Sequence, residues 1–209
     1  IHNAQKSKIF ETQYLGRPRA GEDIVFEPAY VVRHDTLSLY PQDLRYFTFV
    51  DLATWKDKKR ICRNVVLTGA RDSSNHLWIA RVDAGRFNPT EVISLGKAHA
   101  KQFNSKVLVE EVGYQVALRH FAKIDMQTPG SDPYVIESLP VDNRKNAKDL
   151  RIESLQPFVK NGMFHILNGM KDLMQELEDY PHSATKDILD CVGFLIRYAR
   201  PSTKSKPVV

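Results

Sequence analysis

The chain has 209 residues and a mass of 23.9 kDa, with 30 lysines and arginines, 25 acidic residues and 42% hydrophobic residues. These values suit one globular domain, alone or with ordered arms, and the net charge of +5 permits a polyanionic partner without requiring one. No apolar run approaches the ~20 residues that cross a bilayer, no secretory signal opens the chain, and Cys62 and Cys191 are too far apart for a paired metal motif. We therefore expect no membrane partner, and the start at Ile1 leads us to expect a longer parent protein.

The predicted elements lie between a mixed first segment that contains several Gly and Pro residues and a polar tail rich in Pro and Lys. Continuous or alternating apolar runs predict strands, and apolar residues at helical spacing predict helices. In chain order we expect strands at 46–54, 61–68 and 76–82, a helix at 88–103, a strand at 106–110, a helix at 113–121, a strand at 134–139, a helix at 146–159, a short edge strand at 163–167, and helices at 171–178 and 184–199.

This order predicts a mixed sheet. The first three strands are joined directly and form an antiparallel meander, whereas the later strands return through helices as parallel crossovers. Such an order is typical of α/β proteins with the ribonuclease-H-like fold, a mixed sheet with helices on both faces. We expect an N-terminal arm over residues 1–40, one domain over 41–200 and a disordered tail over 201–209.

Asp51 is the most informative residue of the sequence. Aspartate is a poor strand former, yet Asp51 shares one strand face with Phe49, while Val50 and Leu52 occupy the other. Burial of an unpaired carboxylate costs several kcal/mol unless a cation or hydrogen bonds compensate it. The residue pattern thus indicates a metal ligand, and the alternative is an aspartate at a frayed strand end that accepts backbone N–H groups.

Three further acids occupy places from which they can converge on Asp51. Glu110 ends the strand KVLVE, at the edge where α/β sheets place their ligands, and Asp187 and Asp190 share one face of the last helix. Each acid also has a plainer alternative. Glu110 could simply be a solvated residue at a strand end. Asp187 and Asp190 could be ordinary acids of a first helical turn, with Ser183 or Thr185 as the N-cap. Together the four acids predict a cluster that needs Mg²⁺ or Mn²⁺, and two such ions can hydrolyse a phosphodiester.

Five segments in sequence order carry a family resemblance. They are FETQYLGRP at 10–18, FVDLA at 49–53, VEEVGYQVAL at 109–118, KDLRIESLQPFVKNG at 148–162 and LMQELEDYPHSATKDILDCVGF at 173–194. In this order they resemble the C-terminal nuclease domain of large terminase subunits, the packaging-motor proteins of tailed bacteriophages. The resemblance implies catalytic metal ligands at Asp51, Glu110 and Asp187, with Asp190 as a fourth metal ligand. Where the family often has His-Asp-Asp, this chain has Thr185-Lys186-Asp187, which lacks one histidine and one acid.

The resemblance also implies a function and its partners. We expect an endonuclease that uses two divalent ions, Mg²⁺ or Mn²⁺, to cut double-stranded viral DNA with little sequence preference when genome packaging starts and ends. Residues 1–40 would then connect to an ATPase domain of the same full-length chain, and the portal and the small terminase subunit would be neighbours in the motor. The place of action would be the host cytoplasm. No phosphate-binding Gly-x-x-x-x-Gly-Lys-Ser/Thr loop occurs in this chain, so ATP hydrolysis is not its work.

Basic residues near the acids are candidates for DNA contact. The candidates are Arg144, Lys145, Lys148, Arg151 and Lys186, which could contact phosphates without reading bases; the alternative is a solvated helix face. The seven histidines show no paired spacing, so we expect no zinc site.

Two other functions remain open from the sequence. One is another ribonuclease-H-like phosphotransferase of the resolvase or transposase type. The other is a DNA-gripping motor module whose metal site has decayed, which the Thr185-Lys186 departure would favour.

Overall fold

The structure is a computed structural model that describes residues 24–52, 63–110, 127, 135–140, 142, 144, 146–199 and 201. The predicted helix at 113–121, most of the predicted arm and tail, and Lys145 lie outside the described residues.

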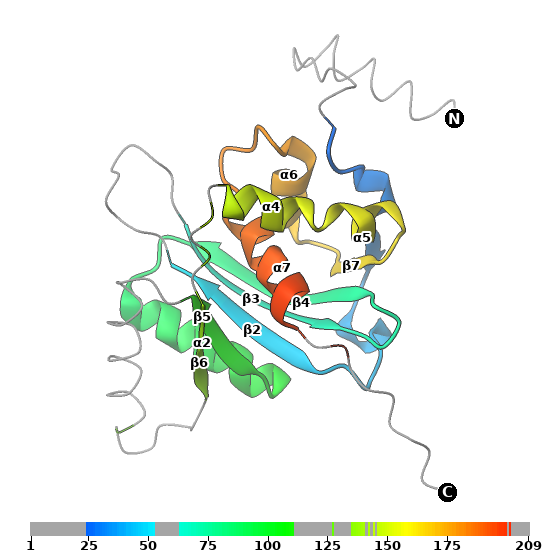
Figure 1. The fold of residues 1–209 in the computed structure, drawn as a ribbon. Coiled ribbons are helices and arrows are strands. Elements are labelled where there is room, and N and C mark those ends of the chain that lie inside the picture. The colour runs from blue at the N-terminus through cyan, green and yellow to red at the C-terminus, as the bar shows by residue number, and fades with distance from the viewer. Residues whose placement is uncertain are drawn as a thin grey trace, which may run out of the picture.

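A seven-stranded mixed sheet forms the centre of the fold (Figure 1). Strands β2, β3 and β4 pair antiparallel, whereas β5 and β6 extend the sheet in parallel beyond β2, and β7 and β1 extend it in parallel beyond β4. The predicted mixed sheet and its initial meander are therefore confirmed. In spatial order the strands are β1 (Val32–His34), β7 (Phe164–Leu167), β4 (Leu77–Gly85), β3 (Asn64–Arg71), β2 (Tyr46–Asp51), β5 (Lys106–Glu110) and β6 (Ile136–Leu139).

Two expectations about the edge of the sheet need correction. Strand β7 is not an edge strand, because β1 pairs with its outer side. Strand β1 was not predicted, since three residues are too few to show a period, and it belongs to the segment expected to be an arm. Phe26 and Val31 are buried in the main core, so the domain begins before residue 41.

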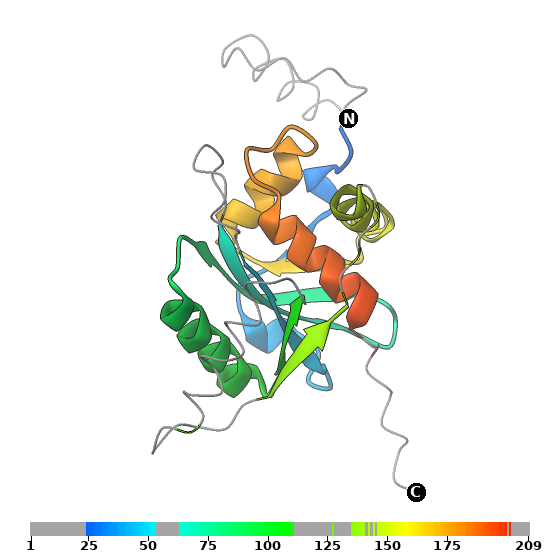
Figure 2. The ribbon, with the colours of Figure 1, turned by 60° about the vertical axis from the view of Figure 1, so that its left-hand side comes forward.

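Helices cover both faces of the sheet, as predicted (Figure 2). On one face α2 (Pro89–Phe103) contacts β2, β3 and β5, and on the other α7 (Asp187–Tyr198) contacts β2, β3 and β4. Helices α4 (Ala147–Glu153) and α6 (Lys171–Asp179) pack against α7. Short elements complete the described fold: α5 (Gln156–Lys160) and the 3₁₀ turns η1 (Pro28–Tyr30) and η2 (Leu37–Leu39).

Alternation along β2 separates two apolar layers. Phe49 lies in the large core beneath α7, and Val50 lies in the smaller core beneath α2. Helix α2 begins at the predicted place because Asn88 and Glu91 form a reciprocal capping box, with side-chain bonds of 3.0 and 2.7 Å.

The predicted helix at 146–159 is divided into α4 and α5. Pro157 has no N–H to donate to the preceding turn, and the hydroxyl of Ser154 donates to the carbonyl of Arg151. Both features favour a break at this point, and they leave α4 as a separate short helix that packs against α7.

Candidate functional site

Two acidic side chains end two adjacent parallel strands. Asp51 is the last residue of β2 and Glu110 the last of β5, and the pairing of Val50 with Val109 places the acids next to each other at one end of the sheet. Because side chains alternate along a strand, both acids share the face of Phe49, which packs beneath α7. The predicted position of Asp51 on an interior strand is confirmed.

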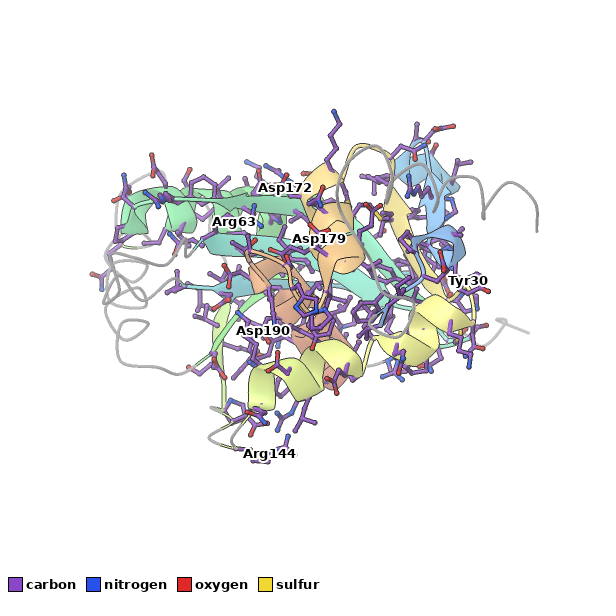
Figure 3. The ribbon with its side chains drawn as sticks, turned by 90° about the horizontal axis from the view of Figure 1, so that it is seen from above. Tyr30, Arg63, Arg144, Asp172, Asp179 and Asp190 are labelled. Atoms are coloured by element: carbon purple, nitrogen blue, oxygen red, sulfur yellow. The ribbon has the colours of Figure 1, made fainter. Side chains whose placement is uncertain are left out.

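Helices α7 and α4 bring matched charges to this end of the sheet. Asp187 and Asp190 lie in the first turn of α7, and Lys148 and Arg151 face them from α4 at the same spacing of three residues. The helices approach closely because Gly193 has no side chain: a Cβ there would lie 2.8 Å from the Cβ of Arg151. Figure 3 shows Asp190 on the side of α7 that faces α4.

Two cations lie within 4 Å of three of the four acids. Lys148 Nζ lies 2.8 Å from Asp187 Oδ1 and 3.7 Å from Asp190 Oδ2. Arg151 donates from Nε and Nη2 to the two oxygens of Asp190, at 2.7 and 3.1 Å. Its buried Nη1 lies 3.9 Å from Glu110 Oε1 and has no hydrogen-bond partner among the described residues. To contact DNA, Arg151 would first have to leave Asp190.

Burial perturbs the ionisation of Asp51 and Glu110. Burial, reinforced by the carboxylates of Asp190, Asp187 and Glu110, raises the pKa of Asp51 to about 7, although Lys148 opposes the shift. Burial also raises the pKa of Glu110, against the opposing effect of Arg151. In both acids, burial disfavours the ionised form more than the neighbouring cations favour it.

Arg63 joins the cluster to helix α6. Its backbone N–H donates to Asp187 Oδ2 at 3.2 Å, so both oxygens of Asp187 have protein donors. Its guanidinium donates to Asp172 at 2.8 Å and to Glu176 at 2.6 Å, and Figure 3 shows Arg63 beside Asp172. Sequence reasoning missed Arg63 because its partners lie more than a hundred residues away.

The N-terminus of α7 is capped from another helix. Glu176 of α6 is 2% exposed, and its Oε2 accepts the backbone N–H groups of Ile188 and Leu189 at 3.0 and 3.1 Å. Its Oε1 accepts the hydroxyl of Thr185 at 2.8 Å. The expected caps, Ser183 and Thr185, do not cap α7 themselves. Glu176 thereby fixes the helix end that carries Asp187.

The cluster can be tested as a metal site by its donors and by its arrangement. Carboxylate oxygens suit Mg²⁺ or Mn²⁺, and four acids against two cations leave two negative charges when all are ionised (4 − 2 = 2). As the side chains stand, however, no three or more His, Cys, Asp or Glu side chains of the described residues are grouped so that they could hold a metal ion. The donor chemistry fits a divalent ion, whereas the arrangement fits protein cations.

The remaining basic candidates pair with acids outside the cluster. Arg144 is exposed and donates to Asp142 at 2.7 Å, and Arg197 binds the same carboxylate. Lys186 pairs with Asp149 at 3.2 Å. Contact between these side chains and DNA stays a prediction.

A histidine group that sequence spacing did not predict lies elsewhere in the sheet. His165 of β7 is hydrogen-bonded to His34 at 3.0 Å and to His76 at 2.8 Å, and its ring stacks on Trp78 with centroids 3.8 Å apart. Because His165 uses its two nitrogens toward different partners, the three rings form a hydrogen-bonded row and do not converge on one metal ion. Trp78 is a packing residue here, and its indole N–H donates to Asp72.

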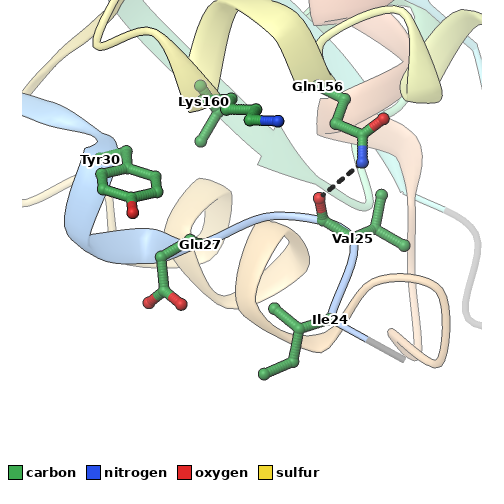
Figure 4. A pocket seen from close by; sticks show the side chains of 7 residues that line it. Ile24, Val25, Glu27, Tyr30, Gln156 and Lys160 are labelled. Carbon is green, nitrogen blue, oxygen red and sulfur yellow. Dashed lines mark hydrogen bonds between the residues drawn. The ribbon is translucent and has the colours of Figure 1, made fainter. Parts of the chain in front are cut away.

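A pocket of about 280 Å³ lies where the described chain begins (Figure 4). Gln156 of α5 donates to the carbonyl of Val25 at 3.4 Å across this pocket. The pocket contains none of the clustered acids; its lining residues are Ile24, Val25, Glu27, Tyr30, Gln156, Val159 and Lys160.

The mixed strand order and the two-sided helical layers define a protein of the ribonuclease-H-like fold. Among solved structures, the chain is similar to the large terminase nuclease of thermophilic phage G20c with bound cobalt, with a TM-score of 0.62 and 14% identity over 87% of this chain and 100% of that chain. The nuclease domain of the P22 large terminase matches with a TM-score of 0.57 and 14% identity, over 85% and 94% of the two chains. The HK97 bacteriophage large terminase matches with a TM-score of 0.54 and 7% identity, over 81% of this chain and 43% of that chain.

At these identities the similarity shows the fold. The G20c nuclease has also been solved with bound zinc and with bound magnesium. The sequence itself matches no protein-family model, and it has no match among curated proteins. Within the described segments, no helix has the length and apolar character needed to span a membrane.

Proposed function

We propose that this chain is the nuclease domain of a large terminase subunit, a metal-dependent endonuclease that cuts double-stranded viral DNA with little sequence preference at the start and end of packaging. The observation that carries the proposal is the meeting of Asp51 and Glu110, from two adjacent parallel strands, with Asp187 of α7. The similarity to the G20c and P22 nucleases supports it, because those proteins share the fold that brings the acids together.

Asp51, Glu110 and Asp187 would hold one or two Mg²⁺ or Mn²⁺ ions, with Asp190 joining them only where its pair with Arg151 opens. Such an ion would supply activation of water and neutralisation of charge at the scissile phosphate. Glu176 and the backbone of Arg63 would position Asp187, and the sheet would fix Asp51 and Glu110.

Double-stranded DNA would lie across the end of the sheet that bears the acids. Arg144, Lys148 and Lys186 are the described candidates for contact with its phosphates, and Lys145 remains a candidate from the sequence. We also propose an ATPase domain in the same full-length chain, the portal and the small terminase subunit as partners, and the host cytoplasm as the place of action.

The test is cleavage of supercoiled plasmid by purified protein with Mn²⁺, Mg²⁺ or EDTA. The wild type should cut only with a divalent ion, and Asp51→Asn should reduce cleavage by about 10³-fold or more, because it removes a negative ligand without changing shape. Asp43→Asn, at an exposed aspartate before β2, is the matched control and should cut normally. Equal cleavage in EDTA, or an active Asp51→Asn variant, would contradict the proposal.

One observation favours a second candidate, a DNA-gripping module without catalysis. Lys148 and Arg151 engage Asp187 and Asp190, so protein cations already serve part of the cluster. Such a module would bind DNA without divalent ions, and the wild-type protein would not cleave the plasmid under any of the three conditions. The plasmid assay separates the two candidates.

A further inference from the structure

The ammonium of Lys148 lies among the acids that the proposed function assigns to a divalent ion. It is 2.8 Å from Asp187 and 3.7 Å from Asp190. Asp51 also attracts it: burial alone would lower the pKa of Lys148, but the three acids together raise it. A divalent ion bound by Asp187 would need the same oxygens and would be repelled by the ammonium, so the two cations compete.

Lys148 and Arg151 differ in how firmly they are held. Arg151 is 9% exposed, binds Asp190 through two parallel bonds, and lies 4.4 Å over the ring of Phe194. Lys148 has a side chain that is 39% exposed and makes one close contact, with Asp187, at the end of a flexible stem. Of the two cations, Lys148 is the one that can leave without opening the core.

We propose that Lys148 is a positioning residue that holds Asp187 and Asp190 in the metal-free protein and is displaced when a divalent ion binds. This rests on the proposed function, because it requires a metal ion at the acids. It accounts for why the described residues contain acids of suitable chemistry but no group arranged to hold a metal. The freed ammonium would be available to a DNA phosphate.

The first test measures Mn²⁺ binding by calorimetry in the absence of DNA. Lys148→Met should bind Mn²⁺ about tenfold more tightly than the wild type, because the ion no longer competes with the ammonium. Lys186→Met is the control. It removes an equal charge near Asp187 but leaves the ion pair between Lys148 and Asp187 intact, because Lys186 binds Asp149. Its affinity for Mn²⁺ should stay close to that of the wild type, and an equal gain in both variants would overturn the proposal.

The second test uses the wild-type protein and does not depend on the folding of a variant. Amine acylation followed by mass spectrometry should label Lys148 several-fold faster when Mn²⁺ is bound, whereas exposed Lys160 of α5 should be labelled at a constant rate. Tight Mn²⁺ binding with unchanged labelling of Lys148 would overturn this inference alone. Failure of both the wild type and Lys148→Met to bind Mn²⁺, with both folded by circular dichroism, would overturn the proposed function as well.

Discussion

Protonation of His165 should make the domain strongly sensitive to mild acid. Its ring is 7% exposed, stacks on Trp78, and lies between His34 and His76. Burial, together with the neighbouring imidazoles of His76 and His34, lowers the pKa of His165 from 6.5 to about 4, with Asp72 opposing the shift. We therefore expect the domain to lose stability when the pH is lowered from 7 to 5.

The size and sign of the effect follow from linkage. Between pH 6.5 and 4 the unfolded chain binds a proton at this residue that the folded chain does not, so the free energy of unfolding falls as the pH is lowered through that window. With the two pKa values above, His165 should cost about 2 kcal/mol of stability on going from pH 7 to pH 5, and roughly 3 kcal/mol by pH 4.

Urea unfolding at a series of pH values measures this directly. His165→Gln keeps a polar side chain but cannot titrate, so its loss of stability between pH 7 and 5 should be about 2 kcal/mol smaller than that of the wild type. His165→Asn, a second variant that cannot titrate at this position, should show the same reduction. The reasoning is refuted if His165→Gln loses as much stability as the wild type, or if an NMR titration gives His165 a pKa near 6.5.

Three further variants test the site by urea unfolding. In EDTA, Asp51→Asn should raise the free energy of unfolding by about 1 kcal/mol, because one of four mutually repelling carboxylates becomes neutral; a loss of stability would indicate a purely structural aspartate. Glu176→Gln should cost about 3 kcal/mol, because the cap of α7 and a buried ion pair are lost, while Glu178→Gln on the same helix should have little effect. Gly193→Ala should lower the free energy of unfolding by about 2 kcal/mol, because its Cβ would lie 2.8 Å from a side chain of α4. Gly96→Ala is the control and should be neutral, because its Cβ would lie 3.8 Å from its nearest neighbour. Equal losses of stability in the two variants would show that contact distance does not decide the outcome.

The central part of the fold was predictable because short runs of neighbouring residues indicate its strands and helix. The apolar residues on both sides of Asp51 identify an interior strand, and the end of KVLVE at Glu110 identifies the strand beside it. The sequence also contains the capping signal at Asn88, which begins α2 where predicted. Each of these signals needs only a few neighbouring residues to be read.

The partners of the acids were not predictable because they depend on distant packing. Lys148 and Arg151 were expected to face DNA phosphates, and the spacing of the two residues on a helix cannot say which surface that helix meets. The cap of α7 by Glu176 likewise requires α6 to fold back beside it. The row of three histidines joins His34 of β1, His76 just before β4 and His165 of β7, and His34 and His165 lie 131 positions apart.

The pairing of β1 with β7 also bears on how the chain acquires its structure. The two strands are brought together across 131 residues, and β7 lies between β1 and β4 in the finished sheet. During synthesis the meander of β2, β3 and β4 can form first, because its strands are close in sequence. The outer edge of β4 stays unpaired until β7 has been made. We therefore expect the sheet to be completed from its middle outward, with β1 joining it only after β7 has been synthesised.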